Sequence, residues 1–180
     1  DLSVNGAYTF NANTVLAGDI TAGNDAMPPA VRNVLSLGGT YTVGTGGNYT
    51  NLTLAVADYN AANCITGPIV FELISTYTSA GETFPISINA NAIAGTNTLT
   101  IRPASGQSPV ITGSSANAIL KLNGADYVII DGSNNGSSSR DLTIENTSTA
   151  TSTAAIWVAS LGTGLGATNN IIRNANIKAG

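Results

Sequence analysis

The strongest constraint on the fold of this chain is a series of short apolar segments that are separated by turns rather than by helices. From Gly67 onward, each segment is four to seven residues long and is bounded by Gly, Asn, Ser or Pro. A doubly wound α/β fold would need a helix after nearly every strand. We therefore expect an all-β fold with strands at Ile69–Ile74, Pro85–Ala90, Leu99–Ala104, Val110–Gly113, Ile119–Leu122, Tyr127–Ile130, Leu142–Asn146, Ala155–Ala159 and Ile171–Ile177.

These segments recur in groups of three, which is typical of a coil with three strands per rung. Residues 99–122 hold one group, residues 127–159 hold a second, and residue 171 opens a third. A single rung cannot bury its apolar side, but rungs stacked at about 4.8 Å build a continuous apolar interior. The repeat predicts a parallel β-helix over residues 37–180 that is truncated inside a rung at its C-terminal end.

One helical pattern precedes the regular strands. Apolar residues recur at i, i+3, i+4 and i+7 between Leu52 and Tyr59, and Thr50 or Asn51 is placed to cap the start. The first rung of a coil exposes an apolar interior and an unpaired strand edge, which proteins cover. We expect a helix over residues 51–61 that caps this end of the coil.

Residues 1–30 are expected to form a separate β segment. Ala7–Ala12 and Asn13–Ala17 predict two strands, and the Pro-Pro pair that follows them indicates a linker, which we place at residues 31–36. Two strands alone are marginally stable in water. We therefore expect one of two arrangements. Either the segment completes a sheet with strands from an upstream module or from a neighbouring subunit, or it is a truncated domain.

Three residues are the candidate contact surface. A strand donated to another sheet offers alternate side chains to pockets, and on this segment these are Tyr8 and Phe10. Trp157 stands between Ile156 and Val158, so it points outward when those two face the interior. The tyrosines are scattered along the sequence and predict no platform for stacking on sugars.

The chain offers few groups for catalysis. It contains no histidine, which removes Ser-His-Asp and Cys-His catalysis and the common zinc sites. The single cysteine, Cys64, is expected to be a buried apolar residue. Asp131 opens a Gly- and Asn-rich stretch that lacks the alternating acids of a calcium loop, so we interpret it as a turn former. We assign no catalytic, cofactor-binding or metal residue. The basic candidates for proton abstraction, which we interpret as a solvated or ion-paired face, are Arg102, Lys121, Arg140 and Arg173.

The small number of charged residues argues against nucleic acid as a partner. Charged residues make up only 9% of the chain, the net charge is −4, and the six Lys and Arg are widely spread. Without a basic stripe to neutralise phosphates, nucleic acid is not expected as a partner. No run of about 18 apolar residues predicts a membrane span, and no leader precedes the strands, so the signal of an exported protein would be removed or lie outside this sequence.

Six stretches carry a resemblance that covers residues 37–180: Gly39–Gly44, the helix, Gly67–Leu73, Thr98–Ala104, Leu122–Asp131 and Leu142–Asn146. They resemble motifs of secreted, pectate-lyase-like right-handed parallel β-helix proteins found on Bacteroidetes-type bacteria. This resemblance implies a right-handed coil and an extracellular location at the cell surface. Through Gly6–Phe10 and Gly23–Asp25, residues 1–30 are similar to the closing strands of an immunoglobulin-like module.

Together these observations favour a noncatalytic extracellular structural or adhesive protein that belongs to a larger assembly. Its expected partners are other copies of itself or neighbouring modules of a longer surface protein, with glycans as a further candidate. The alternative is a carbohydrate-active, polysaccharide lyase-like domain whose site lies outside this chain. An ice-binding face is not favoured, because Thr98, Thr100 and Thr143 are too few and too irregular.

Overall fold

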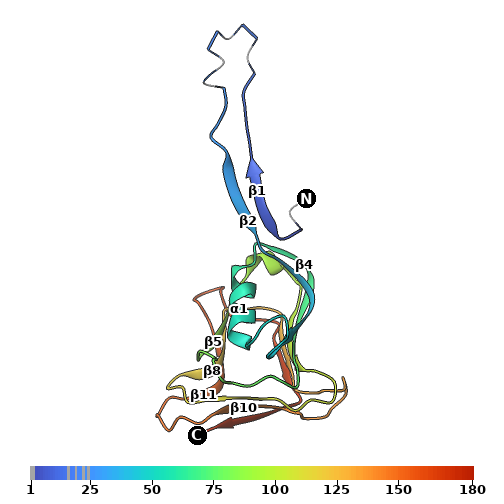
Figure 1. Cartoon of the computed structure of the whole chain (residues 1–180). Helices are drawn as coiled ribbons and strands as arrows, with labels where there is room; N and C mark the ends of the chain where they lie inside the picture. Colours follow the sequence, from blue (N-terminus) through green and yellow to red (C-terminus); the bar gives the residue numbers. More distant parts are fainter. Residues whose placement is uncertain (1–2, 16, 19, 22, 24) are drawn as a thin grey trace.

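The molecule is a parallel β-solenoid from which a two-stranded antiparallel ribbon projects (Figure 1). The structure is a computed structural model that describes residues 3–15, 17, 18, 20, 21, 23 and 25–180. It confirms the expected all-β fold, with a coil of three strands per rung, one capping helix and a separate N-terminal β segment.

Each of the three sheets of the solenoid takes one strand from successive rungs, and all neighbouring strands within them are parallel. Sheet 1 has five strands, whereas sheets 2 and 3 have three strands each. In stacking order, sheet 1 consists of β3 (Ser36–Val43), β4 (Cys64–Leu73), β6 (Leu99–Pro103), β9 (Val128–Asp131) and β12 (Ile171–Arg173). Sheet 2 consists of β7 (Val110–Gly113), β10 (Leu142–Asn146) and β13 (Ala175–Ala179). Sheet 3 consists of β5 (Ile86–Asn89), β8 (Ala118–Asn123) and β11 (Ala154–Ala159).

The rungs follow the groups predicted from the sequence, with one difference. Strands β6, β7 and β8 form one complete rung, and β9, β10 and β11 form the next. The last predicted strand, Ile171–Ile177, is instead two strands, β12 and β13, which belong to different sheets. Asn174 separates them with a φ of 55°, a left-handed conformation that Asn tolerates better than most residues.

The interior is a stack of branched apolar side chains. In sheet 1, Phe71, Ile101 and Ile130 lie at matching positions on successive rungs and are completely buried. Burying such a side chain stabilises the fold by about 1.5–3 kcal/mol. A 3₁₀ turn, η2 (Ala92–Ala94), lies on the connection from β5 to β6.

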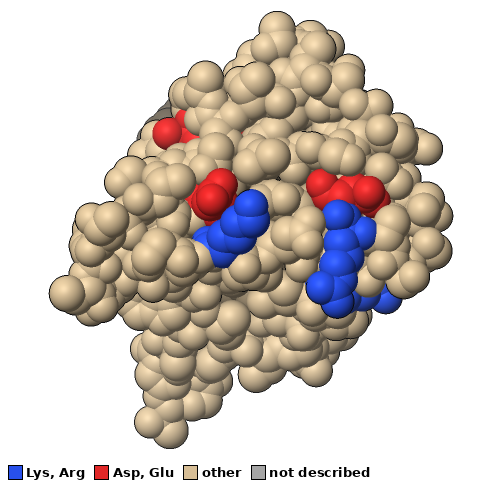
Figure 2. All heavy atoms as spheres, turned by 90° about the horizontal axis from the view of Figure 1, so that it is seen from below, with Lys and Arg blue, Asp and Glu red and all other residues tan. Residues whose placement is uncertain are grey.

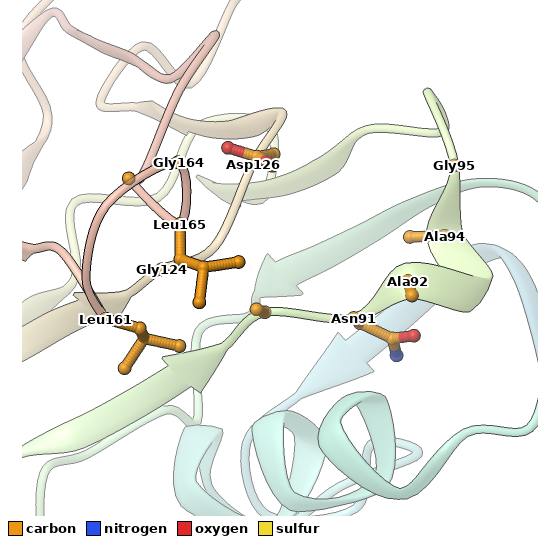
Figure 3. A pocket seen from close by; sticks show the side chains of 11 residues that line it. Asn91, Ala92, Ala94, Gly95, Gly124, Asp126, Leu161, Gly164 and Leu165 are labelled. Carbon is orange, nitrogen blue, oxygen red and sulfur yellow. The ribbon is translucent and has the colours of Figure 1, made fainter.

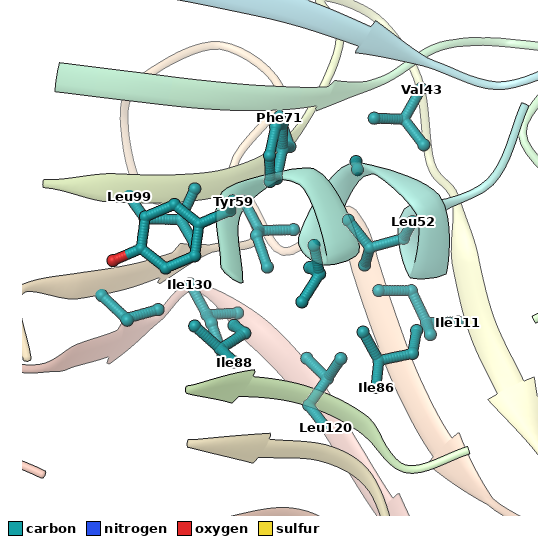
Figure 4. Close-up of a cluster of buried hydrophobic side chains, with 14 of the residues drawn as sticks. Val43, Leu52, Tyr59, Phe71, Ile86, Ile88, Leu99, Ile111, Leu120 and Ile130 are labelled. Carbon is teal, nitrogen blue, oxygen red and sulfur yellow. The ribbon is translucent and has the colours of Figure 1, made fainter. Parts of the chain in front are cut away.

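Helix α1 (Leu52–Ala61) covers the N-terminal end of this stack, as the sequence predicts. Figure 4 shows Leu52 and Tyr59 pointing from the helix among core side chains of several strands. The four residues of the predicted apolar face are all buried: Leu52, Ala55, Val56 and Tyr59.

Two side chains hold the first turn of α1. Asn51 is the cap, and its Oδ1 accepts the amide proton of Leu54 at 2.9 Å. The carboxylate of Glu82, from the following rung, accepts the amide protons of Leu52 and Thr53 at 2.7 Å each. A carboxylate is favourable here because the helix N-terminus carries partial positive charge. Burial and the charge of Glu82 raise the pKa of Tyr77, whose hydroxyl also donates to Glu82 at 2.9 Å.

Helix α1 also closes the outer edge of sheet 3 through one side chain. Asn60 Nδ2 donates to the carbonyl of Ser87 at 2.8 Å, and Asn60 Oδ1 accepts the amide proton of Asn89 at 2.9 Å. Both partners lie on β5, the first strand of that sheet. The amide side chain thus takes the place of the peptide group that a further strand would supply.

A hydroxyl closes the outer edge of sheet 2 in the same way. Ser79 Oγ donates to the carbonyl of Val110 at 3.0 Å and accepts the amide proton of Thr112 at 2.8 Å. Both partners lie on β7, the first strand of sheet 2. The N-terminal edges of sheets 2 and 3 are therefore hydrogen-bonded although no strand pairs with them.

The projecting ribbon differs from the expected N-terminal strands. Strand β1 (Gly6–Phe10) pairs with β2 (Ala30–Val34), not with Asn13–Ala17. Residues 31–36, which the sequence predicts as a linker, hold the end of β2, which runs to Val34, and the start of β3 at Ser36. The two prolines immediately precede β2, where their extended backbone leads into a strand whose other edge is free. Leu16, Asp19 and Asn24, which belong to the expected second strand and turns, lie outside the described residues.

The ribbon is not part of the core, as expected for residues 1–30. No described residue between 3 and 34 is buried, and Phe10 is 49% exposed. Side chains attach its base to the solenoid: Asn5 accepts the amide proton of Ser36, and Asn63 Nδ2 donates to the carbonyl of Asn33 at 3.1 Å.

Charge on the buried face of α1 should unfold the N-terminal end. Leu52→Asp and Val56→Asp each place a carboxylate in an apolar interior, so we expect a loss of about 3 kcal/mol or more in the free energy of unfolding. Leu54→Asp on the exposed face is the matched control and should cost under about 0.5 kcal/mol. Urea denaturation measures all three. Unchanged stability of both buried-face variants would show that α1 does not cover the core.

Removal of the Asn60 amide should weaken the edge of β5. Asn60→Ala leaves a carbonyl and an amide of β5 without their side-chain partner, and we expect a loss of about 1–2 kcal/mol. Asn60→Asp retains the acceptor and should lie between Ala and the original protein at neutral pH. Leu54→Ala, on the exposed face of the same helix, serves as the control. Equal stability of Asn60→Ala and the control would contradict this role for the amide.

Candidate functional site

Trp157 lies on the outside of the solenoid, as the strand alternation predicts. It is 42% exposed on β11, while Ile156, on the opposite face of the strand, packs against the core. Lys121 is the cross-strand neighbour on β8, and its Nζ lies 4.6 Å from the centre of the indole ring. Such cation–π contacts stabilise an exposed pair by about 0.5–1 kcal/mol. The indole therefore packs against Lys121 and leaves part of its surface open to a partner.

Tyr8 and Phe10 lie on β1 of the projecting ribbon, far from Trp157 (Figure 1). Their spacing places both side chains on one face of the strand. The Tyr8 hydroxyl donates to the carbonyl of Val4 at 2.9 Å, whereas Phe10 stays largely open to solvent. The structure therefore does not unite the three candidate contact residues; it gives two separate surfaces, one on the ribbon and one on β11.

Two of the four basic candidates form ion pairs along sheet 1. Arg102 Nη2 lies 3.0 Å from Glu72 Oε1, and Arg173 Nη2 lies 2.8 Å from Asp131 Oδ2. These pairs join neighbouring strands, which agrees with the interpretation of the basic residues as an ion-paired face. Figure 2 shows the Lys and Arg side chains of this face lying against Asp and Glu, while uncharged residues cover most of the face.

Asp131 forms a turn, as predicted. Its Oδ1 accepts the amide proton of Ser133 at 3.1 Å and a proton from Asn174 Nδ2 at 3.0 Å. Partial burial alone would raise the pKa of Asp131, but the hydrogen bonds from Asn174 and Ser133 and the pairing with Arg173 hold this pKa below its ordinary value. The lone pairs of this carboxylate are thus used within the fold. Among the described residues, no group of three or more His, Cys, Asp or Glu side chains is arranged to hold a metal ion.

A hollow of about 220 Å³ lies between the connection that contains η2 and the loop over residues 161–166 (Figure 3). Gly124 is required there, because its φ is +68° and an added Cβ would lie 2.7 Å from Leu161 Cδ1. Hydrogen bonds from Thr168 lower the pKa of Asp126, which borders the hollow. Ligand pockets commonly measure about 300–1,000 Å³. This small, Gly- and Ala-rich hollow is not favoured as a ligand site.

A second hollow, of about 270 Å³, lies beside the ion pair of Arg102. It is bordered by Glu72 and by the turn at Ser133–Gly136, and the Nε of Arg102 is buried without a hydrogen-bond partner. Because Glu72 already pairs with the guanidinium, an anion bound here would meet a carboxylate next to its cation. The geometry does not favour an anion site.

Two expectations about single residues need correction or addition. Cys64 is only half-buried, because it begins β4 in a part of the strand that pairs with β3 but extends beyond β6, whose pairing with β4 starts at Ile69. Three aromatic residues that are scattered in the sequence meet in space, with ring centres 5.9–6.3 Å apart. They are inclined to one another and form no flat sugar platform: Tyr41, Tyr49 and Phe71.

Sequence reasoning missed the residues that close the N-terminal edges, Asn60 and Ser79. Their partners lie 27 to 33 residues away, and the sequence has many similar Asn and Ser residues, so no local signal distinguishes these two.

In the described part of the chain, no helix is long and apolar enough to cross a membrane.

Comparison of the chain with family models, curated proteins and solved structures found no match.

Proposed function

We propose that this protein is a noncatalytic structural or adhesive component of a bacterial cell surface, where it acts outside the cell as part of a larger assembly. The observation that carries the proposal is the β1–β2 ribbon, which projects from a well-packed solenoid and whose two outer edges pair with no other described strand (Figure 1). An isolated two-stranded ribbon is marginal in water, so partner strands would stabilise it. The partners that fit are another copy of this chain or a neighbouring module of a longer surface protein.

The side chains of the ribbon support this role. Phe10 and Val31 are 49% and 53% exposed, and they belong to opposite faces because Val31 pairs with Thr9. A strand that joins a partner sheet contributes main-chain hydrogen bonds along its edge and alternate side chains to pockets. On the face of Phe10, Tyr8 is the second contact residue, and Trp157 offers a separate contact on the solenoid.

The location and the family follow from the resemblance described above rather than from this geometry. Proteins of the type that residues 37–180 resemble are often long and multi-domain, which would place further modules next to this solenoid. The immunoglobulin-like interpretation of residues 1–30 would supply the partner sheet from a module preceding the ribbon. Glycans remain a candidate ligand at Trp157, whose indole is partly open.

The alternative is a carbohydrate-active, lyase-like domain whose site lies outside these 180 residues. An activity screen separates the two proposals when it is run on this chain and on a longer chain that includes the flanking sequence. Each chain is incubated with acidic polysaccharides and calcium, and the unsaturated products of a lyase are followed by ultraviolet absorbance. We expect no turnover. Cleavage by this chain, abolished by substitution of Arg102 or Arg173, would contradict a noncatalytic role.

Deletion of residues 1–34 tests the role of the ribbon. Because no described residue in this range is buried, the solenoid should stay folded, with a melting temperature within about 2 °C of the full chain. Association, measured by analytical ultracentrifugation, should be lost. Phe10→Ser should weaken association in the full chain, whereas Thr9→Ser, on the other face, should change it less. Undiminished association after the deletion would overturn the proposal for the ribbon.

A further inference from the structure

The turn between β9 and β10 gathers hydrogen-bond donors around one side-chain carbonyl. Asn135 is exposed in this turn, and its Oδ1 accepts a proton from the backbone amide of Ser137 at 3.0 Å and from the hydroxyl of the same residue at 2.6 Å. The hydroxyls of Ser133 and Ser139 donate to the same oxygen at 2.9 Å and 3.1 Å. A backbone amide can only donate, so the contact with Ser137 identifies the side-chain atom as the oxygen rather than Nδ2.

The residue that follows Asn135 offers an accessible backbone nitrogen. Gly136 is exposed, and no hydrogen bond to another described residue occupies its amide or the Nδ2 of Asn135. Glycine has no Cβ to shield this nitrogen. The backbone nitrogen after an Asn can attack the side-chain Cγ and close a cyclic imide. The turn therefore brings together the attacking nitrogen, the amide under attack and a set of donors around its oxygen.

The reaction of Asn135 with Gly136 has a defined balance of atoms. The amide nitrogen of Gly136 loses its proton to hydroxide and bonds to Cγ of Asn135, so negative charge develops on Oδ1. The surrounding donors stabilise this charge, because a hydrogen bond to a charged acceptor is stronger than one to a neutral acceptor. Nδ2 then takes a proton from water and leaves as ammonia, which regenerates hydroxide. Water opens the imide at either carbonyl and yields aspartate or isoaspartate.

We propose that Asn135 is a site of spontaneous covalent modification, at which the chain converts its own side-chain amide into a carboxylate. The product adds a negative charge to the rim of the hollow beside Arg102, which Asn135 and Gly136 both border. The reaction consumes only water, so its extent increases with the age of each molecule. This inference goes beyond the proposed function, because it concerns chemistry within the chain and not the binding of a partner.

The other two Asn-Gly pairs of the sequence lack this arrangement. In the solenoid, the amide of Gly124 donates to the carbonyl of Ala159 at 2.8 Å, so the attacking nitrogen is occupied. Asn123 Nδ2, the leaving group, also donates, to a neighbouring side-chain oxygen at 3.0 Å. On the ribbon, the side chain of Asn5 accepts one backbone amide proton, whereas Asn135 accepts from four donors. The fold therefore distinguishes three pairs that are identical in sequence.

Peptide mapping over time tests this difference. The freshly purified full chain is incubated at neutral pH and physiological temperature, and samples are digested and analysed by tandem mass spectrometry. Electron-transfer fragmentation separates isoaspartate from aspartate. We expect Asn135 to be modified first and to give both products, while Asn123 stays intact. In guanidinium chloride, which removes the fold, the rates at these two positions should converge. Modification of Asn123 or Asn5 before Asn135 in the folded chain would overturn the proposal.

Removal of one donor tests the role of the turn. Ser137→Ala keeps the backbone amide but removes the hydroxyl that lies 2.6 Å from Oδ1, so the rate at Asn135 should fall about twofold to tenfold. Ser138→Ala changes the adjacent exposed serine and is the matched control, with an unchanged rate. The melting temperatures of both variants establish that they remain folded. Equal rates in the two variants, or a faster reaction in Ser137→Ala, would show that the hydroxyl does not activate the amide and would overturn the proposal.

Discussion

The structure depends on how the backbone groups at the ends of a stack of parallel strands find hydrogen-bond partners. Inside the stack, every strand pairs on both sides, and the apolar interior is continuous. At the N-terminal end, the carbonyl of Ser87 and the amide of Asn89 bond to the side chain of Asn60 instead of to a strand. Asn60 belongs to α1. The helix that covers the apolar interior therefore also supplies hydrogen-bond partners to this carbonyl and this amide at the N-terminal edge of sheet 3.

Long-range side-chain contacts fix the position of that helix. Glu82 reaches back from the next rung to the first turn of α1, and Asn51 Nδ2 donates to the carbonyl of Gly81 at 3.2 Å. The cap is therefore attached at its N-terminus by Glu82 and near its C-terminus by Asn60. Attachment at two points allows a helix of ten residues, too short to be stable alone in water, to keep one orientation.

The low charge of the chain is consistent with this architecture. Neighbouring strands lie about 4.8 Å apart, so outward side chains at matching positions are close, and like charges there would repel. The few charges that occur on sheet 1 alternate in sign from rung to rung, as Glu72, Arg102, Asp131 and Arg173 do. Polar uncharged residues occupy most of the remaining surface because they can stack on themselves without this cost.

The sequence predicts those elements of the fold that depend on residues close together in the chain. The period of 3.6 residues from Leu52 to Tyr59 predicts α1, and the alternation of apolar residues predicts the strands of the two complete rungs. The partner of β1 is not predicted, because β2 lies beyond a stretch of about twenty residues whose turn signals suggested a nearer strand. The contact surface is predicted only as single residues: Trp157 is outward, but only the fold shows that it lies far from Phe10.

Native-state hydrogen exchange of single backbone amides tests the closure of the N-terminal edges most directly. The amides of Asn89 and Thr112 donate to side chains at these edges. Both amides should be protected, although no described strand pairs with them on that side. Protection that is lost at Asn89 in Asn60→Ala and at Thr112 in Ser79→Ala is the result that the account predicts. Fast exchange of both amides in the original protein, or protection that the two substitutions leave unchanged, would contradict it.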